Sequence, residues 1–187
     1  DNSIEVIWTT GATVRRVSWM DGEFDEELVV SRNAIRLDRL NSGAPFLDSH
    51  GMWSLSNVIG SVLRGSAKIE GSIGTARVRL SGAPDAADRV AKIKEGTVSN
   101  ISVGYRIHAV ERKERDGAIP LHRVTDWEPW EISAVTVPAD AGAQVRSAGK
   151  DADLFDCRVV RAPADHSDLD ALRISMRRRI YEVARRG

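Results

Sequence analysis

Short segments in which apolar and polar residues alternate fill most of this 187-residue chain, and no long amphipathic segment competes with them in its first three quarters. Gly, Pro, Asn or Asp separates one segment from the next, which is typical of strands joined by turns. The segments that predict strands are 4–8, 13–19, 57–80 (two or three strands), 99–112, 121–130 and 131–138. We therefore expect a mostly β (α+β) fold, in which 4–8 and 13–19 form a hairpin around TTGA.

Two segments interrupt the strand pattern with helical features. Residues 31–41 begin with Ser31 in a capping position and carry apolar residues at helical spacing. Residues 83–96 have Pro84 near the start, acids in the first turn, lysines in the last turn and Gly96 just past the end. These are the residues that helix termini prefer, so we expect two short helices beside the sheet.

The composition excludes some classes of protein. Lys plus Arg and Asp plus Glu both number 27, so the formal charge is zero and nothing attracts the whole chain to nucleic acid or membranes. No stretch approaches the roughly 18 apolar residues of a membrane span, and no signal peptide opens the chain. The single cysteine, Cys157, excludes an internal disulfide framework. We expect a soluble, intracellular protein in which Cys157 is structural.

The composition changes after Pro138, where Ala, Gly, Asp and Ser dominate without a sustained period. We interpret residues 1–145 as one domain and residues 146–166 as a linker. Residues 167–187 predict a helix with an apolar stripe and six arginines against one glutamate. A solvated helix packed through its stripe is the simpler interpretation of this tail, and a partner-binding or nucleic-acid-facing arm is the alternative.

Familiar hydrolase signatures are absent from the sequence: it has no G-x-S-x-G elbow, no H-E-x-x-H pair and no phosphate-binding glycine loop. The S-x-x-K of residues 147–150 lies in a Gly/Ala-rich stretch without a rigid frame. The acids of residues 151–156 lack the Gly and the terminal Glu of a calcium loop. We discount both and expect no cofactor and no metal.

Three candidate catalytic residues remain, and the sequence pattern around each of them is weak evidence on its own. His50 follows a short apolar strand in PFLDSHGMW, at a turn where a rigid scaffold can present a side chain. Ser102 shares a strand face with Gly104 in NISVGYR, and a glycine inside a strand often marks a close approach to the backbone. Glu131 stands beside bulky aromatics in DWEPWEISAVTVPAD, where a partly buried carboxylate needs a partner.

The other histidines fit a catalytic role less well. His108 shares the face of Ser102, but six residues of extended chain place it about 20 Å away. His122 begins another strand, and His166 precedes the tail helix. His50 is therefore the best candidate for a general base.

The three segments FLDSHG, NISVGYR and WEPWEISAVTVPAD, in this order and at this spacing, resemble the prohead protease family of tailed bacteriophages. The resemblance covers residues from about 5 to 145. The positions that match the family pattern are His50, residues 102–105, Trp127, residues 131–133 and residues 138–139. The Arg-rich tail lies outside the resemblance.

This resemblance implies a serine endopeptidase packaged inside the assembling procapsid, in the cytoplasm of the bacterial host. Its substrates would be scaffold, or the scaffold-like segment of the major capsid protein, and commonly the protease itself. The implied fold is an antiparallel β-barrel flanked by helices, similar to herpesvirus assemblin. A homo-oligomer is an open alternative, whereas no membrane or nucleic-acid partner is expected.

The resemblance also implies a role for each of the three candidate residues. Ser102 would be the nucleophile, His50 the general base and Glu131 the residue that orients His50. We expect Gly104 to leave room for the substrate backbone, and backbone N–H groups in the loop after Pro138 to stabilise the oxyanion.

The third role remains open between Glu131, His122 and Asp126, because assemblin-like enzymes use a second histidine there. Two other functions also remain as alternatives. The chain could be a non-enzymatic capsid or scaffold module that retains the fold, or a metal hydrolase that uses His50, His122 and a carboxylate.

Overall fold

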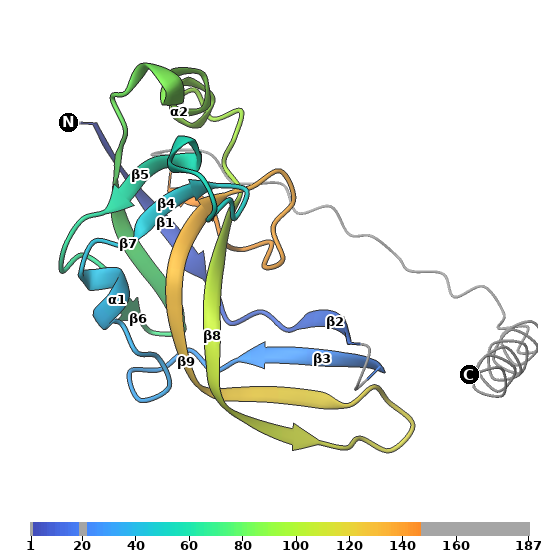
Figure 1. The fold of residues 1–187 in the computed structure, drawn as a ribbon. Helices are drawn as coiled ribbons and strands as arrows, with labels where there is room; N and C mark the ends of the chain where they lie inside the picture. Colours follow the sequence, from blue (N-terminus) through green and yellow to red (C-terminus); the bar gives the residue numbers. More distant parts are fainter. Residues whose placement is uncertain (1, 19–21, 147–187) are drawn as a thin grey trace, which may run out of the picture. The chain divides into compact units, whose positions relative to one another are not determined.

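The structure of the chain is a computed structural model that describes residues 2–18 and 22–146. Ten strands of this part form one sheet, and short helical segments lie between them (Figure 1). The strands are β1 (Ser3–Thr9), β2 (Val14–Ser18), β3 (Gly22–Leu28), β4 (Pro45–Asp48), β5 (Val58–Val62), β6 (Lys68–Glu70), β7 (Ile73–Leu80), β8 (Ile101–Lys113), β9 (Leu121–Ala134) and β10 (Val145–Arg146). The expected mostly β fold is confirmed. The predicted linker beyond Arg146, the tail helix, Cys157 and His166 lie outside the described residues.

The sheet is mixed rather than antiparallel throughout. Its strand order is β10-β1-β7-β5-β4-β9-β3-β2, with β6 added to β7 and β8 added to β9. Strand β9 pairs in parallel with β3 and β4, and the other pairings are antiparallel. The parallel pairing of β4 with β9 places the end of β4 beside the end of β9.

The predicted hairpin between 4–8 and 13–19 is wrong, although both segments are strands. Strand β1 pairs with β7 and β10, and β2 pairs with β3. The Asp140 carboxylate explains why the chain does not turn back at TTGA: it accepts hydrogen bonds from the Thr10 backbone N–H (2.6 Å) and hydroxyl (2.8 Å). A local turn signal cannot reveal such a distant partner.

Two strands predicted separately, 121–130 and 131–138, join into the single strand β9, which ends at Ala134. Figure 1 shows β8 and β9 running side by side and continuing together into a long hairpin. Their register shifts near Gly104 and Tyr105, opposite Pro129, which has no N–H to give to the ladder. Strand β9 therefore carries both ends of the predicted WEPWEISA motif on one continuous element.

The helix predicted over 83–96 is confirmed as a 3-10 turn, η2 (Pro84–Ala86), followed by α2 (Ala87–Lys94). The helix predicted over 31–41 is mostly wrong, since only α1 (Asp38–Asn41) is helical. Residues 32–34 form a turn, and Ile35 forms a parallel bridge with Trp127 of β9. In this bridge the Trp127 N–H donates to Ala34 O (2.9 Å) and the Arg36 N–H donates to Trp127 O (2.9 Å). Tertiary pairing overrides the local helical pattern.

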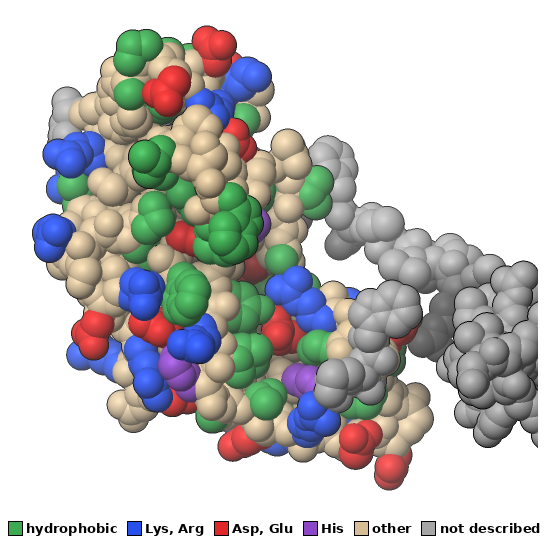
Figure 2. Space-filling view, in the orientation of Figure 1, with side chains coloured by type: hydrophobic (Ala, Val, Ile, Leu, Met, Phe, Trp, Pro, Cys, Tyr) green, Lys and Arg blue, Asp and Glu red, His purple; other side chains and the backbone are tan. Residues whose placement is uncertain are grey.

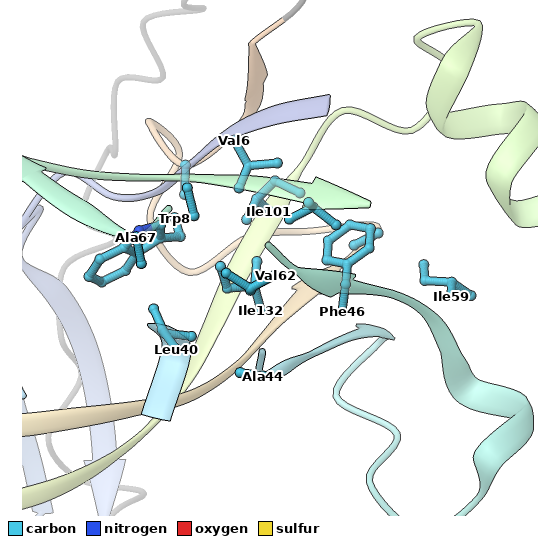
Figure 3. Close-up of a cluster of buried hydrophobic side chains, with 14 of the residues drawn as sticks. Val6, Trp8, Leu40, Ala44, Phe46, Ile59, Val62, Ala67, Ile101 and Ile132 are labelled. Carbon is cyan, nitrogen blue, oxygen red and sulfur yellow. The ribbon is translucent and has the colours of Figure 1, made fainter. Parts of the chain in front are cut away.

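The core lies between the strands and is built around large side chains from several of them (Figure 3). Trp8 of β1 and Trp127 of β9 are both fully buried and meet edge to face, with ring centroids 5.9 Å apart. Phe46 of β4, Ile101 of β8 and Ile132 of β9 are also fully buried. These buried side chains determine which faces of β4, β8 and β9 point into the core. They therefore also determine which residues lie on the opposite faces of these strands.

The chain after β9 returns to the sheet, so the change of composition after Pro138 does not begin a linker. Ala143 is fully buried, and its carbonyl accepts the N–H of Ile101 (3.0 Å). The Val145 N–H donates to Ser99 O (2.8 Å), and the Ile7 N–H donates to Gln144 O (2.8 Å). Residues 143–146 therefore bridge β1 and the start of β8. No helix in the part of the chain described here is long and apolar enough to span a membrane.

Truncation tests where the folded body ends. A chain cut after Arg146 should keep a cooperative thermal transition, because every strand of the described sheet is retained. A chain cut after Pro138 should lose it or melt far lower, because β1 and β8 lose the hydrogen bonds that residues 143–146 supply. Circular-dichroism melts check this. Unfolding of the longer fragment would show that the tail belongs to the core.

Candidate active site

His50 projects from a tight turn at the end of β4. The Gly51 N–H closes this turn on Asp48 O (2.9 Å), and Ser49 and His50 both have left-handed backbones, with φ of 51° and 60°. Such conformations cost roughly 1–3 kcal/mol each for residues other than glycine and concentrate at functional sites. The strain persists here because several contacts hold the turn in place.

Those contacts all come from the end of β9. The Ser49 N–H donates to Ala134 O (3.0 Å), and the His50 N–H donates to the Ser133 hydroxyl (3.1 Å). The imidazole Nδ1 of His50 lies 2.6 Å from Oε1 of Glu131. The parallel pairing of β4 with β9 brings the turn to this position, with Leu47 opposite Ser133 and Asp48 opposite Ala134.

Glu131 is a buried carboxylate whose two oxygens both have partners. Only 3% of its side chain is exposed, against 41% for His50. Oε1 faces the His50 ring, and Oε2 accepts a 2.5 Å hydrogen bond from the Ser133 hydroxyl. Burying a charge is costly unless it is paired and hydrogen-bonded, and this arrangement meets both needs.

Gly104 has a different role from the expected one. It lies opposite Glu131 in the β8–β9 ladder, and a Cβ at Gly104 would collide with Glu131 Oε1. The carboxylate, rather than a substrate backbone, occupies the space that the missing side chain leaves. The expectation that Gly104 makes room for substrate is therefore wrong, and the glycine instead lets the carboxylate lie over β8.

The hydrogen bond to Glu131 raises the pKa of His50 above its ordinary value of 6.5, and partial burial opposes this only in part. Because Nδ1 faces the carboxylate, that nitrogen carries a proton and Nε2 is left to accept one. The pair thus sets the tautomer that a general base requires.

Ser102 lies on the same side of β8 as the His50–Glu131 pair. It is directly opposite Ser133, and Gly104, two residues on, is directly opposite Glu131. Opposite residues in such a ladder share a face, with Cβ atoms about 5 Å apart. Among the contacts of the described residues, none joins the Ser102 hydroxyl to His50. Catalytic hydrogen bonds are often long in the absence of substrate, so the shared face is the relevant observation.

The other candidates for the third member have different partners. Asp126 makes a two-pronged ion pair with Arg36 (2.8 and 2.5 Å), which lowers the pKa of Asp126. His122 stacks on Phe24 with ring centroids 4.1 Å apart, nine residues and about 30 Å along β9 from Glu131. Neither contacts His50. The same separation keeps His122 from sharing a metal ion with His50, which removes the basis of the metal-hydrolase alternative.

Ser133 holds two parts of the site at once, a role that was not predicted from the sequence. Its hydroxyl accepts the His50 N–H and donates to Glu131, and the residue is fully buried. A signal for it existed, because alternation along β9 places Ser133 on the same face as Glu131. No pattern in the sequence showed that the His50 turn would lie beside the end of β9.

The loop after β9 borders Ser102. Residues Ala139, Asp140 and Ala143 line a small cavity together with Ser102. The Gly142 N–H donates to the Asp140 carboxylate (3.0 Å), and the Ala143 N–H donates to Asp140 O (3.0 Å). The N–H groups of residues 139–141 have no partner among the described residues, so this loop holds free donors beside the Ser102 strand.

Comparisons with known proteins identify a family and one relative. A family model described as caudovirus prohead serine protease matches residues 19–166. The chain is also 36% identical, over 115 residues, to a protein named major capsid protein from Halomonas phage phiHAP-1. That alignment covers 62% of this chain but 19% of the phage protein, so the chain spans about a fifth of that relative's length. No solved structure matches significantly.

Gly104→Ala tests the packing of the carboxylate. The added methyl should displace Glu131 from His50 and destabilise the fold by about 1–3 kcal/mol, the usual cost of overpacking. The matched control is Gly82→Ala, because a Cβ at Gly82 meets no atom within 4 Å. Proton NMR should show the hydrogen-bonded Nδ1 proton of His50 in the wild type and the control, and lose it in Gly104→Ala. Persistence of that signal in all three proteins would contradict the assignment.

The pH dependence of His50 follows from the sign of its shift. A raised folded-state pKa means that the charged pair stabilises the fold fully below the unfolded pKa, and that this stabilisation fades as pH rises through the folded pKa. NMR titration should place His50 above 6.5 in the wild type and lower in Glu131→Gln. A titration point that is unchanged by Glu131→Gln would show that another group controls the histidine.

Proposed function

The chain belongs to the caudovirus prohead serine protease family, and from this premise we propose that it is a serine endopeptidase with Ser102, His50 and Glu131 as its catalytic residues. The observation that carries the proposal is the 2.6 Å contact between His50 Nδ1 and the buried Glu131, on the strand face that Ser102 shares. A base oriented by a buried carboxylate beside a serine is the arrangement that nucleophilic acyl transfer requires.

In the proposed mechanism, His50 Nε2 takes the proton from the Ser102 hydroxyl as its oxygen attacks the scissile carbonyl. Glu131 stabilises the imidazolium that forms, without itself taking the proton. The imidazolium then protonates the leaving amine, and a water molecule activated by the same base releases the acyl group. General-base assistance contributes roughly 10²- to 10⁴-fold to such a reaction. The contact from Ser133 to both His50 and Glu131 supports this geometry, because it restricts how either can move.

We propose that the oxyanion is stabilised by backbone N–H groups of residues 139–141. Ala139 and Asp140 line a cavity that Ser102 also lines, and the N–H groups of residues 139–141 have no partner among the described residues; both observations support this role. Asp140 holds the loop through Thr10 and Gly142, which fixes its donors in advance. Donors that need no reorganisation are worth roughly 10²- to 10³-fold each.

We further propose that the sheet closes into a barrel similar to assemblin. The bridge between Asn100 and Gln144 supports this, because Gln144 precedes β10, which pairs with β1. Pairings β1-β7-β5-β4-β9-β8 continue from there around to Asn100. A closed ring would hold the ends of β4, β8 and β9 rigidly, as a catalytic constellation requires.

The proposed biological role is maturation of the procapsid from within. We propose that the protease cleaves scaffold, or the scaffold-like segment of the major capsid protein, and itself, inside the assembling particle in the host cytoplasm. The family and the phage relative named major capsid protein support an association with capsid proteins.

That relative's name also supports a second candidate, a capsid or scaffold module without catalytic activity. A serine-reactive probe separates the two functions, because a module without activity should not react with it.

A matched set of variants tests the proposed catalytic residues. A fluorophosphonate probe should label Ser102, and Ser102→Ala should abolish both labelling and peptide cleavage. Glu131→Gln should lower turnover by roughly 10²- to 10⁴-fold, because it keeps the shape but favours the wrong tautomer of His50. Asp126→Asn and His122→Ala should stay within about tenfold of the wild type, a change of under about 1.4 kcal/mol in the barrier.

Thermal melts serve as the control for folding in each variant. Labelling that survives Ser102→Ala would overturn the nucleophile. Near-normal cleavage by Glu131→Gln together with collapse in His122→Ala would move the orienting role to His122.

A further inference from the structure

A cleft of about 370 Å³ opens beside the His50 turn. Leu47 and Pro45 of β4, Val58 of β5 and Glu131 of β9 line it from the sheet. Residues 51–55, between the His50 turn and the 3-10 turn η1 (Leu55–Asn57), line it from the loop above. Of the three proposed catalytic residues Glu131 lines the cleft, and its carboxylate also contacts His50, so the cleft adjoins the His50–Glu131 pair.

The loop over this cleft presents large apolar side chains to solvent. Trp53 is 95% exposed, Leu55 is 89% exposed and Met52 is 56% exposed. Figure 2 shows hydrophobic side chains gathered on the face around this loop. Such residues exposed as a group, rather than singly, mark a surface that binds something.

The loop has a defined shape despite this exposure. A Cβ at Gly51 would collide with Asn57, so the two ends of the loop are packed together. The Ser54 hydroxyl accepts the Ser56 N–H at the start of η1 (3.3 Å) and lies 2.8 Å from the Ser56 hydroxyl. The apolar side chains are thus presented by an ordered turn.

Trp130 of β9 also lines the cleft, and several contacts hold it. The guanidinium groups of Arg39 and Arg106 lie 4.9 and 5.6 Å from its ring centroid. Its indole N–H donates to Glu128 (3.2 Å). Cation–π contacts from two arginines hold the ring in place.

The charged groups that line the cleft already have partners. The Arg39 guanidinium contacts Glu128 at 3.2 Å as well as the Trp130 ring. Both oxygens of Glu131 are occupied by His50 and Ser133. The remaining lining residues are mostly apolar, so the cleft suits an uncharged, apolar group.

We propose that this cleft is a substrate subsite that takes one bulky apolar side chain, such as leucine, methionine or phenylalanine, from the peptide being cleaved. The inference rests on the proposed function, because a peptide attacked by Ser102 must pass the His50 turn that borders the cleft. Trp53, Met52 and Trp130 are its specificity-determining residues. They close over the side chain and remove it from water.

The first test measures cleavage specificity with a peptide library prepared by digesting bacterial proteins. Mass spectrometry of the new termini should show enrichment of bulky apolar residues at one position near the cleaved bond. Trp53→Ala should reduce that enrichment by roughly tenfold or more, since one apolar contact discriminates by about that factor. Val17→Ala is the matched control, because Val17 is 76% exposed on β2 and does not line the cleft.

The second test needs no catalysis and uses the Ser102→Ala protein. N-acetyl-leucine methylamide and N-acetyl-aspartate methylamide are titrated while the tryptophan indole N–H signals are followed by NMR. The leucine probe should shift the signals of Trp53 and Trp130, whereas the aspartate probe should not. The fully buried Trp8 and Trp127 provide internal controls that should remain unchanged.

The two tests separate the subsite from the proposed function. Leucine-specific shifts without any cleavage by the wild type would support the subsite and contradict the protease. Cleavage whose sequence preference is unaffected by Trp53→Ala, or equal shifts with both probes, would overturn the subsite. A Trp53→Ala defect confined to an intact capsid protein, with normal peptide cleavage and no leucine shift, would also overturn it, by showing that this surface docks a whole protein.

Discussion

The buried carboxylate of Glu131 determines what each of its neighbours can be. A charge taken out of water is stable only if hydrogen bonds and an opposite charge replace its hydration. Ser133 supplies one hydrogen bond and His50 supplies the other, together with a positive charge when it is protonated. The residue beneath the carboxylate must be a glycine, because any Cβ at Gly104 would displace it. The raised pKa of His50 is a further consequence of the same contact.

Strand β9 brings these groups together because the two strands beside its last residues, β4 and β8, run in different directions. Its parallel partner β4 ends where β9 ends, which delivers the strained turn and His50 to the Glu131 carboxylate. Its antiparallel partner β8 begins at the same place, which delivers Ser102 opposite Ser133. A mixed sheet thus gathers three segments far apart in the sequence, and the Trp127 and Ile132 side chains anchor β9 in the core.

Patterns that depend on near neighbours in the sequence were predictable, and those that depend on distant partners were not. Strands and the 83–96 helix followed from alternation and capping residues, whereas the pairing of His50 with Glu131 was expected only from the resemblance to the prohead protease family. The hairpin after β1 and the helix at 31–41 were predicted wrongly, because Asp140 and Trp127 capture those segments from far along the chain. The space over Gly104 was assigned to substrate, since no local pattern shows where a neighbouring carboxylate will lie.

The most direct measurement of the central claim is a crystal structure of the protein after reaction with a fluorophosphonate. The account predicts phosphorus bonded to Ser102 Oγ, with His50 Nε2 within hydrogen-bonding distance of the adduct and Nδ1 still on Glu131. The phosphonyl oxygen should point to the N–H groups of residues 139–141. An adduct on another residue, or a His50 ring turned away from Ser102 toward a different partner, would contradict it.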